Sequence, residues 1–141
     1  MKRNASAEWT GGIRDGKGTI TTDSGVLKQT QYSFSTRFED GVGTNPEELI
    51  GAAHAGCFSM ALSLQLGNAG FTVQSIQTKA AVDLAKGETG FAITGVHLDV
   101  AVKATGADQA AFEKAAEAAK SGCPVSRALS VPITMNARLE A

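Results

Sequence analysis

Residues 45–70 read NPEELIGAAHAGCFSMALSLQLGNAG, with no formal charge after Glu48. Asn45 can cap a helix, Pro46 suits the first helical position, and Glu48 completes a capping box. Gly70 is a suitable stop signal. The stretch therefore predicts one long helix from Pro46. Because this helix is uncharged on nearly every side, we expect it to lie buried in a core or an interface.

The same stretch is about as long as a membrane span requires. Its composition opposes that interpretation, since His54, Ser59, Ser63 and Gln65 are polar and most of their neighbours are small. We therefore expect the helix of a soluble domain, with small residues that let another helix approach closely.

On either side of this helix, the sequence alternates as strands do and contains the glycine turns that separate strands. The expected strands are Ala7–Thr10, Lys17–Thr22, Gln31–Phe38, Thr72–Leu84, Phe91–Val102 and Ser130–Leu139. The fourth and fifth form a longer antiparallel pair, and every second residue from Thr94 to Val102 faces one apolar side. Asp108 or its neighbours cap a second helix that ends at Gly122. This order describes an α+β fold, and no repeat or linker divides residues 1–141, so we expect one domain.

Composition excludes several functional classes. The chain has 141 residues, 43% of them apolar, and a formal net charge of −1. Its basic residues are scattered, which argues against a nucleic-acid face or an anionic membrane as the main partner. Two cysteines are too few for a secreted disulfide scaffold, and the first residues lack the apolar run of a signal peptide. We expect a cytoplasmic protein.

The two cysteines lie in contexts that differ in their effect on a thiol. Cys57 is in the middle of the long helix, where apolar neighbours raise the pKa of a thiol and neither helix end lowers it. If Cys57 reacts, a cation must reach it from elsewhere, and an arginine held by a carboxylate would serve. Cys123 directly precedes Pro124 and can begin a short helical turn whose free amides favour a thiolate. The pair therefore suggests a dithiol redox site.

Other interpretations of these residues stay open. Cys57 alone would most often be a buried packing residue. His54 precedes Cys57 by three positions and could act as its base, or could be kept for packing or a hydrogen bond. His54, His97, Cys57 and Cys123 could be counted as zinc ligands, but they lack the short paired spacing of such sites. No glycine-rich phosphate loop is present, so a nucleotide cofactor is not expected.

Two motifs carry a resemblance to a known family. Residues 43–62, GTNPEELIGAAHAGCFSMAL, resemble the first-cysteine helix of the osmotically inducible protein C (OsmC) family, which includes the organic hydroperoxide resistance (Ohr) proteins. Residues 122–126, GCPVS, are similar to its second-cysteine motif. The resemblance covers nearly the whole chain and is strongest to the OsmC branch. It implies an OsmC-like fold, with antiparallel sheets wrapped around a long buried central helix in an intertwined homodimer.

The resemblance also implies an activity. Cys57 would attack a peroxide and become a sulfenic acid, and Cys123 would condense with it to a disulfide. Arg37 would ionise Cys57 and polarise the peroxide, with Glu47 holding Arg37, although Arg14 resembles the arginine of the sister branch. The expected enzyme is a thiol peroxidase of oxidative and osmotic stress defence, without metal or other cofactor. It would reduce organic hydroperoxides better than hydrogen peroxide, and the resemblance implies that a dithiol such as a lipoylated protein restores it.

Helix geometry adds an expectation about assembly. Glu47 and Cys57 are ten positions apart (57 minus 47), which is about 15 Å along one helix. A single chain cannot easily bring them together, so an arginine held by Glu47 would serve a cysteine of another subunit. Two rival functions remain: a thiol redox sensor that is read by a partner, and a carrier of apolar ligands.

Overall fold

The structure is a computed structural model that describes residues 1–140. These residues form two compact units, the first from Met1 to Leu49 and the second from Ile50 onward. A single domain over 1–141 stays a prediction. The α+β composition that the sequence predicts is confirmed, with helices and strands in both units.

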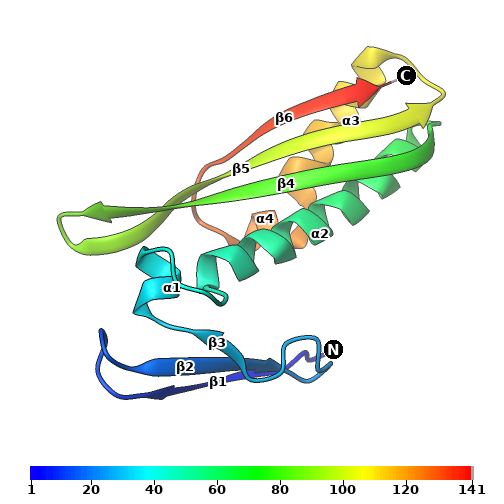
Figure 1. The fold of residues 1–141 in the computed structure, drawn as a ribbon. Coiled ribbons are helices and arrows are strands. Elements are labelled where there is room, and N and C mark those ends of the chain that lie inside the picture. The colour runs from blue at the N-terminus through cyan, green and yellow to red at the C-terminus, as the bar shows by residue number, and fades with distance from the viewer. Residues whose placement is uncertain (141) are drawn as a thin grey trace. The chain divides into compact units, whose positions relative to one another are not determined.

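The first unit contains a three-stranded antiparallel sheet in the order β1-β2-β3. Its strands are β1 (Ala5–Thr10), β2 (Lys17–Thr22) and β3 (Thr30–Tyr32), drawn in blue shades in Figure 1. Gly11 has a φ of +96°, a backbone conformation that favours glycine, and it begins the turn from β1 to β2. The first two predicted strands are therefore confirmed.

The predicted strand Gln31–Phe38 is wrong in its second half. The strand ends at Tyr32, and a short helix follows, α1 (Phe34–Phe38). Ser33 and Thr36 form a capping box, in which the Thr36 backbone N–H donates to Ser33 Oγ at 3.3 Å and the Ser33 N–H donates to Thr36 Oγ1 at 2.8 Å. A threonine in place of the usual glutamate hides this helix start in an otherwise strand-like pattern.

The long helix is confirmed as α2 (Pro46–Asn68). At its start, the Glu48 backbone N–H donates to the Asn45 side chain at 2.7 Å. At its end, Gly70 takes a φ of +92° and the Phe71 N–H donates to the Leu66 carbonyl at 2.9 Å. With a second bond from Gly70 to Gly67, this is a Schellman motif.

Burial of α2 differs from the prediction. The buried residues form one stripe along the helix, made of Glu47, Gly51, His54, Phe58, Leu62 and Leu66. The other faces are open, and Met60 and Leu64 are 78% and 62% exposed. A helix buried on nearly every side is thus wrong for one chain, because a sequence does not say which chain covers an apolar face. Among the described residues, α2 is also the one helix long and apolar enough to cross a membrane, a test that core helices pass as well.

The second unit contains a three-stranded sheet in the order β4-β5-β6. β4 (Thr72–Gly87) and β5 (Gly90–Thr105) form the predicted antiparallel hairpin, which continues further toward its turn than the sequence suggests. β6 (Ile133–Glu140) pairs in parallel with β5, from Val96 opposite Ile133 onward. The second sheet is therefore mixed, and the expectation of purely antiparallel sheets is wrong at this strand. The chain can reach this parallel register because two helices lie between β5 and β6.

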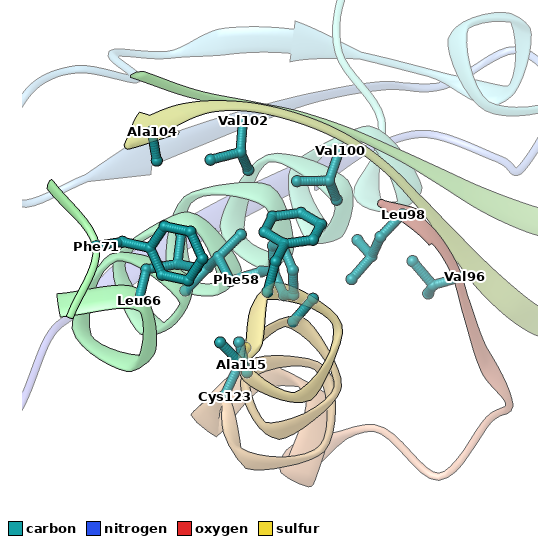
Figure 2. Close-up of a cluster of buried hydrophobic side chains, with 14 residues drawn as sticks. Phe58, Leu66, Phe71, Val96, Leu98, Val100, Val102, Ala104, Ala115 and Cys123 are labelled. Atoms are coloured by element: carbon teal, nitrogen blue, oxygen red, sulfur yellow. The ribbon is translucent and has the colours of Figure 1, made fainter. Parts of the chain in front are cut away.

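These two helices are α3 (Gln109–Gly122), capped by Asp108 as predicted, and the short α4 (Pro124–Ala128). The core of the unit lies where α2 and α3 pack on one face of the sheet (Figure 2). Alternate β5 residues face Phe58, Leu62 and Leu66 of α2 and Phe112 of α3, and they are Val96, Leu98, Val100, Val102 and Ala104. Burying each large side chain stabilises the fold by about 1.5–3 kcal/mol. This packing fixes the α2–α3 pair that carries the cysteines.

Candidate active site

The structure brings the two cysteines of the second unit together. Cys57 projects from the middle of α2, and Cys123 lies at the junction of α3 and α4. They are 66 positions apart in sequence (123 minus 57), yet their sulfurs are in hydrogen-bond contact. Both are free thiols; Cys123 is fully buried and Cys57 is partly exposed. The two thiols are therefore neighbours, as a dithiol redox site requires.

Local sequence explains the position of Cys123. It ends α3, since its backbone N–H donates to the Ala119 carbonyl at 3.0 Å, and it also caps α4. Pro124 occupies the first turn of α4, and the Ser126 N–H donates to Cys123 Sγ at 3.5 Å. The sulfur thus replaces the oxygen that normally caps a helix.

The two thiols differ in acidity. Burial raises the pKa of Cys57, and its contact with Cys123 raises it further, against one backbone hydrogen bond from Val125. Burial also disfavours the Cys123 thiolate, but hydrogen bonds from the Ser126 backbone, the Cys57 thiol and the Ser126 hydroxyl outweigh it and lower the pKa of Cys123. Both directions agree with the expectations from sequence. Of the two, Cys123 is therefore the more acidic thiol in the reduced chain, and Cys57 is the weaker acid.

A fully buried histidine, His54, lies on α2 one helical turn before Cys57. His54 Nε2 is 2.7 Å from Ser126 Oγ, and His54 Nδ1 is buried without a hydrogen-bond partner in the described chain. Among the described residues neither nitrogen forms a hydrogen bond with Cys57. The structure therefore does not contain the pair in which His54 would act directly as the base of Cys57. The role of Ser126 was missed from sequence, although its place three residues after a helix-capping cysteine is a usable signal.

A shallow groove opens beside Cys57. It has a volume of about 470 Å³ and is lined mainly by apolar groups, among them Met60, Ala61, Leu64 and Pro124. Such a surface suits an alkyl chain better than a polar ligand.

The first unit holds the other predicted residues, Arg37 and Glu47. Arg37 Nε donates to Glu47 Oε1 at 2.9 Å, and Arg37 Nη2 lies 2.8 Å from the same oxygen. Both nitrogens therefore share one oxygen instead of pairing with two, and Glu47 Oε2 is buried without a partner in the described residues. The Arg37 side chain remains 39% exposed. A guanidinium held in this way has a fixed direction and an open side.

An aromatic pocket that the sequence reading missed adjoins Arg37. It has a volume of about 210 Å³ and is lined by Trp9, Ile13, Tyr32, Ser33, Phe34, Arg37 and Phe38. Arg14, the alternative arginine, places its guanidinium 4.8 Å from the centre of the Phe34 ring. Arg37 also lies over an aromatic ring, 5.3 Å from the centre of Phe38, so the two arginines differ in that Arg37 is paired with a carboxylate as well.

Within residues 1–140, no three His, Cys, Asp or Glu side chains gather closely enough to hold a metal ion. His97, one of the four zinc candidates, instead places Nδ1 2.7 Å from Thr134 Oγ1 on the surface of the sheet.

Comparison with known proteins agrees with this geometry. The family model described as OsmC-like protein matches residues 38–137. The chain belongs to the OsmC-like family. It is 54% identical to Peroxiredoxin OsmC of Escherichia coli over 140 residues, covering 99% of this chain and 98% of that protein. This relative supports the OsmC branch.

More distant members extend the same result. Organic hydroperoxide resistance protein OhrB of Bacillus subtilis is 35% identical over 113 residues, covering 79% of this chain and 80% of that protein. A solved structure from Legionella pneumophila, described as an organic hydroperoxide resistance protein OsmC, superposes with a TM-score of 0.70 at 25% identity, covering 98% of this chain and 97% of that one. The OsmC-like fold is therefore confirmed.

Proposed function

We propose that this OsmC-like chain is a thiol peroxidase that reduces organic hydroperoxides to alcohols. The observation that carries the proposal is the contact between the Cys57 and Cys123 sulfurs, in a chain whose relatives are named peroxiredoxin and organic hydroperoxide resistance protein. Two neighbouring thiols can together give up the two electrons that one peroxide takes up, and they become a disulfide when they do so.

The proposed reaction has two steps within the protein. The Cys57 thiolate attacks the outer oxygen of the hydroperoxide, so that an S–O bond forms, the O–O bond breaks, and the alkoxide takes a proton to become an alcohol. Cys123 then attacks the Cys57 sulfenic acid, so that an S–S bond forms and hydroxide leaves as water. An external dithiol reduces the disulfide, and no metal or organic cofactor is required.

We assign the activation of Cys57 to Arg37. Because burial raises the pKa of Cys57, a nearby positive charge is needed to stabilise the Cys57 thiolate. The ion pair with Glu47 supports Arg37 over Arg14, since it fixes the direction of the guanidinium while leaving it partly exposed. The same cation would polarise the peroxide and stabilise the departing alkoxide.

We further propose an intertwined homodimer with shared active sites. The open side of α2 carries Met60 and Leu64 together with small residues such as Gly56, and such a surface favours close packing against a second copy. The separation of Glu47 from Cys57 along one helix supports an arginine supplied by the partner chain. Burial of α2 on its remaining sides would then be complete in the dimer.

The apolar groove beside Cys57 supports organic hydroperoxides as the preferred substrates, because an alkyl chain gains from burial there and hydrogen peroxide does not. We propose a dithiol such as a lipoylated protein as reductant and the cytoplasm as compartment, since cycling between dithiol and disulfide needs a reducing environment. Defence against oxidative and osmotic stress is the physiological role that fits this activity.

A turnover assay tests the proposal. The reduced protein is mixed with cumene hydroperoxide and an excess of dithiothreitol, and peroxide loss is followed for many equivalents per chain. Continued turnover that stops in Cys57→Ser is the expected result. If the wild type consumes about one equivalent per chain and then stops, the protein is a redox sensor. If the wild type consumes no peroxide and Cys57→Ser still binds alkyl compounds, the protein is a carrier.

A further inference from the structure

His54 and Ser126 form a buried hydrogen bond that the proposed chemistry does not use. His54 is completely buried on α2, one helical turn before Cys57, and Ser126 is 8% exposed on α4. Their side chains meet at 2.7 Å. A polar group buried this deeply destabilises the folded protein unless it forms a hydrogen bond, so this pair has a structural or a chemical role.

The bonding pattern decides which atom carries the imidazole proton. Burial lowers the pKa of His54, so the ring is neutral and has one N–H. Among the described residues Nδ1 is buried without a partner, and a buried acceptor without a donor is less unfavourable than an unpaired N–H. The proton therefore belongs on Nε2, which donates to Ser126 Oγ.

This tautomer gives the Ser126 hydroxyl a direction. Its oxygen already accepts from His54, so its own proton is available to donate, and a hydrogen bond from the Ser126 side chain is one of the causes that lower the pKa of Cys123. A chain of donors then runs from His54 Nε2–H to Ser126 Oγ–H to Cys123 Sγ. The Ser126 backbone N–H adds a second bond to the same sulfur at 3.5 Å.

We propose that His54 and Ser126 are positioning residues for the disulfide-forming step, holding the Cys123 sulfur as an anion aimed at Cys57. The inference rests on the proposed function and deepens it. In that step the Cys123 thiolate donates an electron pair to the Cys57 sulfenic sulfur, the S–O bond breaks, and the hydroxide that leaves takes up a proton to form water. Neither His54 nor Ser126 touches the peroxide.

The titratable groups that face Cys123 are few. In the described part of the second unit these are Cys57, in direct contact, and His54, acting through Ser126, both from α2. On α3, Lys120 is paired with Glu117 at 3.1 Å on the surface. The Ser126 hydroxyl is therefore the group whose removal changes the surroundings of Cys123 most selectively.

Removing the hydroxyl would change both the ionisation of Cys123 and its orientation, and the size and pH dependence of the rate loss separate these two effects. Raising the pKa of a thiol by one unit lowers its thiolate fraction about tenfold below that pKa, while nucleophilicity rises only about threefold. Ionisation alone therefore slows the step about threefold, and at alkaline pH this loss disappears. Any slowing that persists at alkaline pH reports lost orientation.

The test measures the two steps separately by rapid mixing with cumene hydroperoxide. Sulfenic acid is counted by trapping with dimedone, and disulfide is counted by loss of free thiols in mass spectra. Ser126→Ala and His54→Leu remove the donor chain, whereas Ser126→Thr and His54→Gln keep a donor in place. Thr78→Val is the matched control, since it removes a 2.8 Å side-chain bond from β4 to Ser59 on α2 that does not involve the thiols.

We expect disulfide formation to slow about tenfold in Ser126→Ala and His54→Leu at neutral pH, with sulfenic acid formation changed by less than about twofold. Ser126→Thr and His54→Gln should recover most of the rate, and Thr78→Val should match the wild type in both steps. Disulfide formation at the wild-type rate in Ser126→Ala overturns the proposal. Equal slowing of both steps also overturns it, because that is the behaviour of a structural tie between α2 and α4.

A second measurement is independent of peroxide chemistry. In a Cys57→Ser background, ultraviolet absorbance reports the ionisation of Cys123 alone, and Ser126→Ala should move its midpoint upward by about one pH unit. No upward movement contradicts the donor chain even if the protein turns over peroxide. Conversely, absence of sulfenic acid in the wild type with an intact midpoint shift rejects the proposed function and leaves the donor chain standing. Ser126→Ala, a small change, carries the test if His54→Leu fails to fold.

Discussion

The Arg37–Glu47 ion pair and the Cys57–Cys123 thiol pair are built by different means. The ion pair joins residues ten positions apart, and it depends on a short capped helix and the first turn of the next one. The thiol pair joins positions 57 and 123, and it depends on the packing of α2 against α3 in a shared core. One is a local device and the other a product of tertiary structure.

The difference also concerns exposure. The guanidinium is 39% exposed, whereas Cys123 is fully buried and the pKa of Cys57 is raised by burial. Water screens an exposed charge, but it also allows that charge to meet a separate surface. The comparison teaches that the charge proposed to activate and the sulfurs proposed to react are built in different units of the chain, and each prediction below tests that division of roles.

The largest effect should come from the sulfurs. Cys57→Ser should reduce peroxidase turnover by at least about a thousandfold, to the uncatalysed level, because no other group can take the oxygen. Cys123→Ser should still consume about one equivalent of cumene hydroperoxide per chain and then stop or slow sharply with dithiothreitol. A Cys57→Ser protein that keeps its turnover would remove the thiol pair from the mechanism.

Removing the charge should have the next largest effect. Arg37→Met should lower kcat/KM for cumene hydroperoxide about a hundredfold, since a single charged donor to a developing anion has roughly that effect. Arg14→Met is the matched control, because Arg14 stacks on Phe34 and is not held by Glu47. A change below about threefold is expected there. If the two variants exchange these results, Arg14 is the activating residue.

Mixing subunits tests whether Arg37 of one chain acts on Cys57 of the other chain in a dimer. Cys57→Ser and Arg37→Met chains are unfolded together and refolded, and random pairing makes about half of the dimers mixed. Each mixed dimer would contain one complete shared site, so about a quarter of wild-type activity should return. Activity no higher than the average of the separate variants would mean that each chain supplies its own arginine.

The smallest effect should come from the cap of α1. Ser33→Ala removes the side chain that accepts from Thr36 and should cost about 1 kcal/mol of helix stability. Since Arg37 lies in the last turn of α1, kcat/KM should fall by up to about fivefold. Asp108→Ala is the matched control, because it removes the same kind of cap from α3. That variant should lower the thermal midpoint with little change in kcat/KM.

Local sequence signals were sufficient for much of the fold. Asn45, Pro46 and Gly70 mark the ends of α2, and Asp108 marks the start of α3. α1 was missed because Thr36 replaces the usual glutamate of a capping box, and the parallel pairing of β6 was missed because pairing between distant strands leaves little mark on either one.

The candidate site could be predicted only in part. The directions of the Cys57 and Cys123 pKa shifts followed from helix position and burial. The contact between the two sulfurs followed from family resemblance, because spacing alone does not bring positions 57 and 123 together. The bond from His54 to Ser126 and the aromatic pocket beside Arg37 depend on tertiary packing and were not predicted.

The opposite pKa shifts of the two cysteines have a consequence for a chain whose Cys57 is not next to an arginine. The pKa of Cys123, the sulfur that solvent cannot reach, is lowered, and the pKa of Cys57, the sulfur that solvent reaches, is raised. Electrophiles such as iodoacetamide require an accessible thiolate, so a Cys57 without a nearby arginine should react with them slowly. The reactivity of the exposed thiol would then depend on the arrival of the arginine, so that a complete site and a reactive sulfur would appear together.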